Sequence, residues 1–286
     1  MAVYERTWRR YHGELTSLRR RWLVVTRYAI ADAFASRLFT AFYALCYLPS
    51  VAGIFFIYLS HNASLLQQLG APPDLMNVLT DQFFMVLFSW QAIPAFLVAV
   101  IISPNLIASD LSNNALPLYL GRPIDRHEYV LGKAAVLAIL LSPMTWVMGL
   151  AIFLLQAYFE GADWALENYR IGIAYVGGHA AWIVVISTLT LAISAWVKFK
   201  PAARGALFAI IFILAGFAQA VNGVTGTSFG DLFHLVRAIN SVVLSLFGAP
   251  TPSGLPVWLN WSTLIATTAL SIWLLGRKLR PHEVVT

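Results

Sequence analysis

The stretch LFTAFYALCYLPSVAGIFFIYLS, residues 38–60, decides the fold because it is apolar, carries no charge and is long enough to cross a bilayer. A helix needs about 20 consecutive apolar residues to span the roughly 30 Å of hydrocarbon in a membrane. Five further runs of the same character follow it along the chain. They cover residues 83–103, 134–158, 171–197, 205–222 and 257–276. The sequence therefore predicts an all-α, polytopic membrane protein with six transmembrane helices.

The composition of the whole chain agrees with six spans and leaves no room for a separate soluble domain. Of its 286 residues, 59% are hydrophobic and 11% are charged, whereas soluble domains average about 25% charged residues. We predict a single transmembrane domain over residues 1–286. Within it we distinguish an N-terminal part at 1–37, a loop at 104–133 between the second and third spans, and a segment at 223–256 between the fifth and sixth.

The distribution of positive charge predicts the orientation. If the N-terminus is placed inside, all of the 19 Lys and Arg residues lie on the inner side except Arg170 and Arg237, while the acidic residues divide almost evenly. Lys and Arg, rather than net charge, set membrane topology. We therefore expect both termini in the cytoplasm and a location in a bacterial cytoplasmic (inner) membrane. Because the basic residues flank the spans instead of forming one stripe, we expect anionic lipid and not nucleic acid as their partner.

The N-terminal part has the pattern of a basic amphipathic helix. Trp8, Tyr11, Leu15 and Trp22 belong to an apolar series spaced by three and four residues, which is the helical period. A basic helix with Trp on its apolar face is expected to lie in the membrane interface, and packing against a partner protein is the alternative. A second short helix is predicted at 28–37, and Pro49 is expected to kink the first span.

The segment between the fifth and sixth spans combines two kinds of sequence. Residues 223–230 are rich in Gly and Thr and predict a loop. Asp231 is a suitable N-cap for a helix that runs to about residue 247. This helix is too short and too polar to span, so we expect a surface-lying or re-entrant helix on the outer side.

The six spans contain no charged residue, which bears on the class of protein. Proton- and sodium-driven carriers depend on intramembrane ionisable groups, so an ion-coupled carrier is disfavoured. The polar residues within or at the ends of spans include Gln91, His179, Gln219 and Asn222. Interhelical hydrogen bonds are their ordinary role, and they are also the candidates for a translocation path.

Enzymatic chemistry has little support in the sequence. The six His and the single Cys show no paired metal-ligand spacing. Residues 226–230 match G-x-S-x-G around Ser228, but this pattern indicates a nucleophile only between a strand and a helix with His and Asp partners. We expect no catalytic residue, no metal and no cofactor on this chain. An intramembrane hydrolase or lipid-modifying enzyme that uses Ser228 is an alternative, but the spans hold no paired catalytic residues for it.

The most specific stretch is the inner loop, SPNLIASDLSNNALPLYLGRPIDRHEYVLGK, residues 103–133. It predicts a short helix that leaves the membrane, a turn near Gly121 and Pro123, and a second short helix that returns at Lys133. Leu116 and Leu118 place apolar surface outside the bilayer, and such surface needs something to bury it. A plain amphipathic connector lying on the lipid is the alternative.

This loop resembles that of the ABC-2 family of ABC transporter permeases in the runs I-A-x-D, A-L-x-L-Y-L, R-P-I-x-R and E-Y-V-L-G-K. The basic N-terminal helix, the six spans and the polar outer segment agree with the same family. Gly121 stands where relatives often have Ser or Ala, and Asn105 stands where a small residue is common. The resemblance implies two permease chains, identical or homologous, and two ATP-binding cassette subunits that hold ATP and Mg²⁺.

The resemblance also implies that the loop transmits the motion of the ATPase to the spans, and that the transporter exports its substrate. Its candidate coupling residues are Asp110, Leu116, Leu118, Arg122, Arg126, Tyr129 and Lys133. The uncharged spans fit a hydrophobic or amphipathic cargo. The alternative function is a non-transport membrane anchor or mechanical subunit of a larger membrane assembly.

Overall fold

The computed structural model describes residues 17, 20–62, 81–113, 125–197 and 199–279, and the regular structure in these ranges is helical. Six helical segments are long and apolar enough to cross a membrane. Their bounds are Arg37–Ser60, Gln82–Ser112, Arg126–Glu160, Tyr169–Trp196, Lys200–Thr225 and Val257–Lys278. The prediction of a helical, multi-pass membrane protein is therefore confirmed by the length and composition of its helices.

The first span consists of two helices, α2 (Arg37–Leu45) and α3 (Leu48–Ser60). The break falls at residues 46–47, and Pro49 occupies the first turn of α3, where its missing N–H does no harm. The predicted interruption of this span is thus present.

The helix before the first span differs from the prediction. One continuous helix, α1 (Arg21–Ala35), replaces the separate helix expected at 28–37. It ends at Ser36, whose extended backbone and side-chain oxygen begin α2 by accepting a hydrogen bond from the backbone N of Phe39 at 3.3 Å. Trp8, Tyr11 and Leu15 lie outside the described residues, so the interfacial helix stays a prediction.

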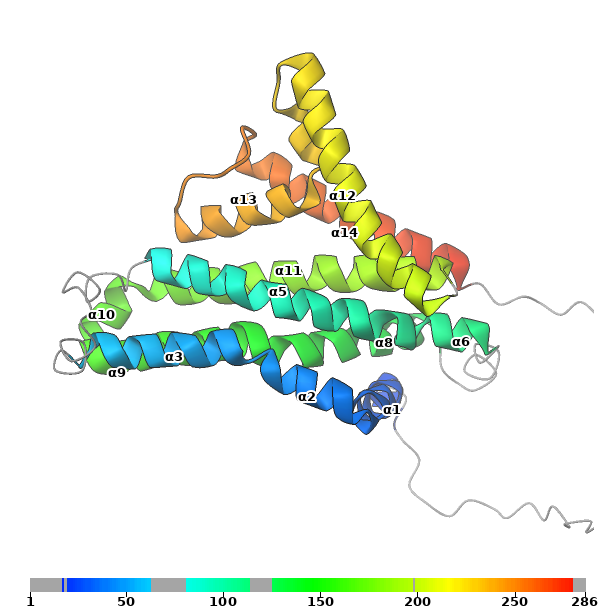
Figure 1. Cartoon of the computed structure of the whole chain (residues 1–286), viewed down its shortest axis with the longest axis horizontal. Helices are drawn as coiled ribbons and strands as arrows, with labels where there is room; N and C mark the ends of the chain where they lie inside the picture. Colours follow the sequence, from blue (N-terminus) through cyan, green and yellow to red (C-terminus); the bar gives the residue numbers. More distant parts are fainter. Residues whose placement is uncertain (1–16, 18–19, 63–80, 114–124, 198, 280–286) are drawn as a thin grey trace, which may run out of the picture.

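The body of the molecule is a bundle of helices that run side by side, with α11 (Tyr169–Trp196) in contact with several of the others (Figure 1). The others are α3, α5 (Asp81–Leu106), α8 (Arg126–Ser142), the π-helical turn η3 (Pro143–Val147) and α9 (Met148–Glu160). Small residues allow these helices to approach closely. At Gly149, for example, the ring of Tyr175 fills the space that a Cβ would occupy.

The last two spans are arranged differently from the first four. Helix α12 (Lys200–Thr225) leaves the bundle at a steep angle, and α14 (Val257–Lys278) packs against α11 (Figure 1). Between them lie the short 3₁₀ helix η4 (Phe229–Phe233) and α13 (Leu235–Phe247). The predicted cap at Asp231 is wrong: α13 begins later, and the side chain of His234 accepts from the backbone N of Arg237 at 3.2 Å.

Helix α13 is packed into the helical body. Val243 lies against Gly178 of α11, and Gly248, just after α13, lies beside the guanidinium of Arg170 near the start of α11. The two helices therefore run antiparallel, and α13 also packs against α14. The choice between a surface-lying and a re-entrant helix stays a prediction.

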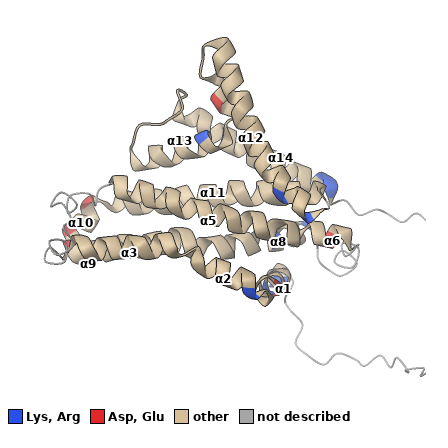
Figure 2. Cartoon of the chain, in the orientation of Figure 1, with Lys and Arg blue, Asp and Glu red and all other residues tan. Residues whose placement is uncertain are grey.

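Positive charge gathers at one end of the molecule, which we call the basic end (Figure 2). Its Lys and Arg residues come from α1, the starts of α8 and α12, and the end of α14, while the short helix α6 (Ala108–Ser112), which carries Asp110, lies at the same end. The opposite end carries α10 (Ala162–Glu167) and the acidic residues Glu160, Asp163 and Glu167.

Candidate functional site

The two ends of the inner loop meet at the basic end through a buried ion pair. The Nζ of Lys133 in α8 lies 2.8 Å from Oδ2 of Asp110 in α6, and the Tyr129 hydroxyl donates to the same oxygen at 2.7 Å. The side chains of Lys133 and Asp110 are only 5% and 14% exposed. Tyr129 and Lys133 are one helical turn apart, so both reach the same carboxylate. We call Asp110, Tyr129 and Lys133 the loop clamp.

The start of α8 is fixed by a capping box. The backbone N of Asp125 donates to Oε2 of Glu128 at 3.1 Å, while the side chain of Asp125 caps the helix in return. This arrangement sets where α8 begins and therefore which face presents Tyr129 and Lys133. Arg126, the first residue of α8, is exposed.

Gly132, from the same loop motif, allows α1 to pack closely against α8. A Cβ on Gly132 would lie 2.9 Å from the carbonyl oxygen of Trp22, so only glycine allows α1 to approach this closely. The hydroxyl of Thr26 donates to the carbonyl oxygen of Gly132 at 2.9 Å. Thr26 was missed by sequence reasoning, because a lone Thr on a helix carries no signal for a partner 106 residues away.

The remaining coupling candidates fall into two groups. Leu116, Leu118 and Arg122 lie outside the described residues, and Arg126 is exposed at the basic end. The loop clamp itself is buried within this chain. Its residues can position the loop, whereas contact with a partner would fall to Arg126 and to residues 114–124. These roles stay predictions.

Two of the candidates for a translocation path lie in the core of the single chain. The side chain of Gln91 donates to Oγ of Ser50 at 2.7 Å and accepts a short hydrogen bond from the Tyr175 hydroxyl. The Nδ1 of His179 lies 3.2 Å from the carbonyl oxygen of Tyr175, and the His179 ring packs on Phe88. Gln91 and His179 are fully buried. They therefore hold α3, α5 and α11 together rather than facing the surface.

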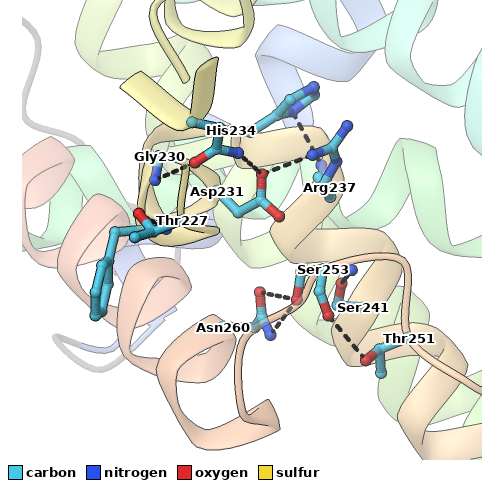
Figure 3. A network of polar contacts seen from close by, with 11 residues as sticks. Thr227, Gly230, Asp231, His234, Arg237, Ser241, Thr251, Ser253 and Asn260 are labelled. Carbon is cyan, nitrogen blue, oxygen red and sulfur yellow. Dashed lines mark hydrogen bonds and ion pairs between the residues drawn. The ribbon is translucent and has the colours of Figure 1, made fainter. Parts of the chain in front are cut away.

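The other two candidates lie on α12, away from this core. Gln219 is exposed, while Asn222 accepts from the backbone N of Gly230 at 2.7 Å and donates to Oδ1 of Asp231 at 2.9 Å. The guanidinium of Arg237 in α13 also forms an ion pair with Oδ1 of Asp231 at 2.6 Å (Figure 3). The four candidates are thus not brought together in one path within a single chain.

The ion pair between Asp231 and Arg237 is a feature that sequence reasoning missed. The six predicted spans carry no charge, so a buried carboxylate was not expected in the segment between the fifth and sixth spans. Asp231 is nevertheless only 3% exposed there. The two residues are six positions apart across a break between η4 and α13, and this spacing matches no regular helical face. Asp231 joins the far end of α12 to the start of α13.

A second polar network, next to the first, anchors the loop that follows α13. The backbone N of Ser253 donates to Oγ of Ser241 at 3.3 Å, and the side chain of Asn260 in α14 donates to Oγ of Ser253 at 2.9 Å (Figure 3). All three side chains are buried. The loop is therefore fixed to both α13 and α14.

The side chains of Asp231 and His234, the residues near Ser228 in sequence, are held by other partners. Asp231 is engaged by Asn222 and Arg237, and Nδ1 of His234 accepts from the backbone of Arg237. Burial and the neighbouring guanidinium lower the pKa of His234, which lies outside the six spanning helices. His234 thus serves as a helix cap, and Asp231 joins α12 to α13.

No protein-family model matches the chain, and no curated protein sequence is significantly similar to it. The functional assignment therefore depends on the loop residues and on the contacts that they make.

Proposed function

We propose that the chain is the membrane-spanning permease subunit of an ABC-2 type transporter, which exports a substrate across a bacterial cytoplasmic membrane. In this proposal the basic end and both termini face the cytoplasm, in line with the preference of Lys and Arg for that side. ATP and Mg²⁺ are held by a separate ATP-binding cassette subunit, and this chain performs no catalysis.

One observation carries the proposal: the motif residues that resemble those of ABC-2 permeases are the ones that tie the loop to the spans. Asp110, Tyr129 and Lys133 close the loop, and Gly132 seats α1. A displacement of residues 114–124 would consequently move α6, α8 and α1 together. A partner can drive such a motion only through contacts that differ between its two states, and we assign these contacts to Leu116, Leu118, Arg122 and Arg126.

The exposed face of α12 supports a second permease chain, identical or homologous. Only 11% of the apolar window of this span is buried, and Phe212 is 71% exposed. A Cβ on Gly216 would meet nothing within 4 Å. Small and large apolar residues that alternate on an exposed helix face suit close packing between helices in a membrane.

A non-transport anchor or mechanical subunit is the second candidate. The exposed face of α12 is mostly apolar, and this favours it. Gln219 is the exposed amide on α12, while Gln91 and His179 are buried within the chain. An apolar seam suits a scaffold, whereas a path for a polar solute needs polar lining. An unchanged cellular activity of the complex in Gln219→Leu would support the scaffold. A loss of that activity with the complex still assembled would favour transport.

The test is affinity purification of the tagged full chain in mild detergent, followed by mass spectrometry of the recovered proteins. The proposal predicts a soluble chain with a phosphate-binding loop, and it predicts that Leu116→Asp/Leu118→Asp abolishes this recovery. Leu166→Asp at the opposite end, where Leu166 is 73% exposed, is the control and should leave recovery unchanged. Recovery of this chain alone, even after cross-linking, would overturn the assignment.

A further inference from the structure

The basic end contains an open cavity of about 1340 Å³ to which the transport proposal assigns no ligand, although Asp110 and Lys133 of the loop clamp line part of it. It lies between α1 and α2 on one side, α5 and α6 in the middle, and the start of α12 on the other. Sites for drug-sized ligands are typically about 300–1,000 Å³. This cavity has room for a larger, amphipathic molecule.

One wall of the cavity is apolar. Leu38, Phe39 and Phe42 of α2 face it together with Ile101 and Ile102 of α5. Leu38 is 82% exposed, so the wall extends to the outside of the chain within a spanning segment. Acyl chains are the natural occupants of such a wall, because apolar surface on a span is matched by lipid.

The opposite wall carries two cations at the start of α12. Lys200 and Arg204 line the cavity one helical turn apart. Neither forms an ion pair with a carboxylate in the part of the chain that the structure describes. The Nε of Arg204 is buried and has no hydrogen-bond partner there. A buried donor without a partner is costly, so this nitrogen points to a missing acceptor.

The position of these cations on the helix strengthens the case for an anion. Lys200 is the first residue of α12, where a basic side chain is unfavourable because the N-terminal end of the helix dipole is itself positive, and Arg204 follows one turn later. Two carboxylates and a third cation also line the cavity: Asp110 is paired with Lys133, while Asp32 on α1 is exposed, as Lys200 is on α12. A negative group between Lys200 and Arg204 would relieve the repulsion and supply the acceptor.

We propose that this cavity binds an anionic phospholipid, with its phosphate at Lys200 and Arg204 and its acyl chains along α2 and α5. Basic pockets between spanning helices at the inner surface are suited to anionic headgroups. The combination of two cations with an apolar wall selects a lipid rather than a free phosphate. This assignment does not depend on the transporter proposal, since it concerns only the cavity of the single chain.

The test is native mass spectrometry of the full chain in detergent, titrated with short-chain lipids. Dioctanoyl phosphatidylglycerol is expected to bind more tightly than dioctanoyl phosphatidylcholine. In Lys200→Gln/Arg204→Gln its affinity should fall about thirtyfold, at about 1 kcal/mol for each basic residue. The matched control is Arg277→Gln/Lys278→Gln, which removes one Arg and one Lys at the same end but outside the cavity.

Three results would overturn the proposal. Equal binding of the two lipids would show that charge is not recognised. An equal loss in both double variants would show a general effect of net charge. Competition by glycerol 3-phosphate at the same concentration as the lipid would assign the cavity to a soluble anion. The lipid site is supported if Arg277→Gln/Lys278→Gln keeps its affinity for phosphatidylglycerol while Lys200→Gln/Arg204→Gln loses it.

Discussion

At the scale of single residues, the loop clamp shows why Asp110 and Lys133 are informative as a pair. A lysine that is 5% exposed needs a carboxylate and hydrogen bonds to offset the loss of its hydration. Asp110 supplies the carboxylate, and Tyr129 completes its hydrogen bonding. The motif therefore has a structural reason in this chain, whatever partner docks on the loop.

Replacing Asp110 by Asn should destabilise the protein by about 3–5 kcal/mol, because Lys133 would lose the carboxylate that offsets the burial of its side chain. The midpoint of thermal unfolding in detergent measures this effect. Asp110→Asn/Lys133→Met should recover part of the loss, since neither charge remains. Glu160→Gln breaks the more exposed pair with His61 and is the control, with an expected loss below about 1 kcal/mol. Equal losses in Asp110→Asn and Glu160→Gln would contradict a buried clamp.

Gly132 gives a second prediction at this scale. Gly132→Ala should destabilise the docking of α1 by about 1–3 kcal/mol, because the new methyl group meets the Trp22 carbonyl at 2.9 Å. Limited proteolysis within α1, compared with unfolding of the whole chain, reports on this docking. Gly276→Ala, where a Cβ meets nothing within 4 Å, is the matched control. Unchanged protection of α1 in Gly132→Ala would refute the close approach.

At the scale of elements, the contact between α12 and η4 decides how the last two spans are connected. The carbonyl oxygen of Ala218 occupies the position of a Cβ on Gly230, so these backbones touch. Asn222 and Asp231 add hydrogen bonds across the same contact. The far end of α12 is held by this contact while much of its length remains exposed.

Gly230→Ala should therefore displace η4 and lower stability by about 1–3 kcal/mol, as other overpacked sites do. Gly223→Ala on α12 has open space around its Cβ and should be neutral or slightly stabilising, because Ala favours a helix over Gly. Thermal unfolding of the two variants side by side measures the difference. A neutral Gly230→Ala would contradict the docking of η4 on α12.

The spans were predictable because each is a long apolar run, and this signal does not depend on tertiary contacts. The start of α13 was not, because Asp231 is the preferred cap by residue type, but its carboxylate is bound by Asn222 and Arg237 and the cap is His234. For the loop clamp, the residues were predictable and their contacts were not. Its residues stood out by resemblance, but nothing in their spacing indicated that they would bind one another.

At the scale of the whole molecule, the separation of charge predicts a fixed orientation. In a Cys46→Ala background, Asp163→Cys should react with a membrane-impermeant maleimide in intact cells. Arg126→Cys, also exposed but at the basic end, should react only after the membrane is opened. Cys46 is the single cysteine of the chain, so the background protein should not be labelled. Labelling of Arg126→Cys in intact cells would reverse the topology.

The most direct test of the central claim is site-specific photo-cross-linking in cells from the inner loop. A photoreactive residue at position 116 should capture a soluble chain that carries a phosphate-binding loop, identified by mass spectrometry. The same residue at position 166, at the opposite end of the molecule, should not capture it. An adduct with an ATP-binding chain from position 116 alone is the predicted result. No such adduct, or equal adducts from both positions, would contradict a permease driven by a separate ATPase.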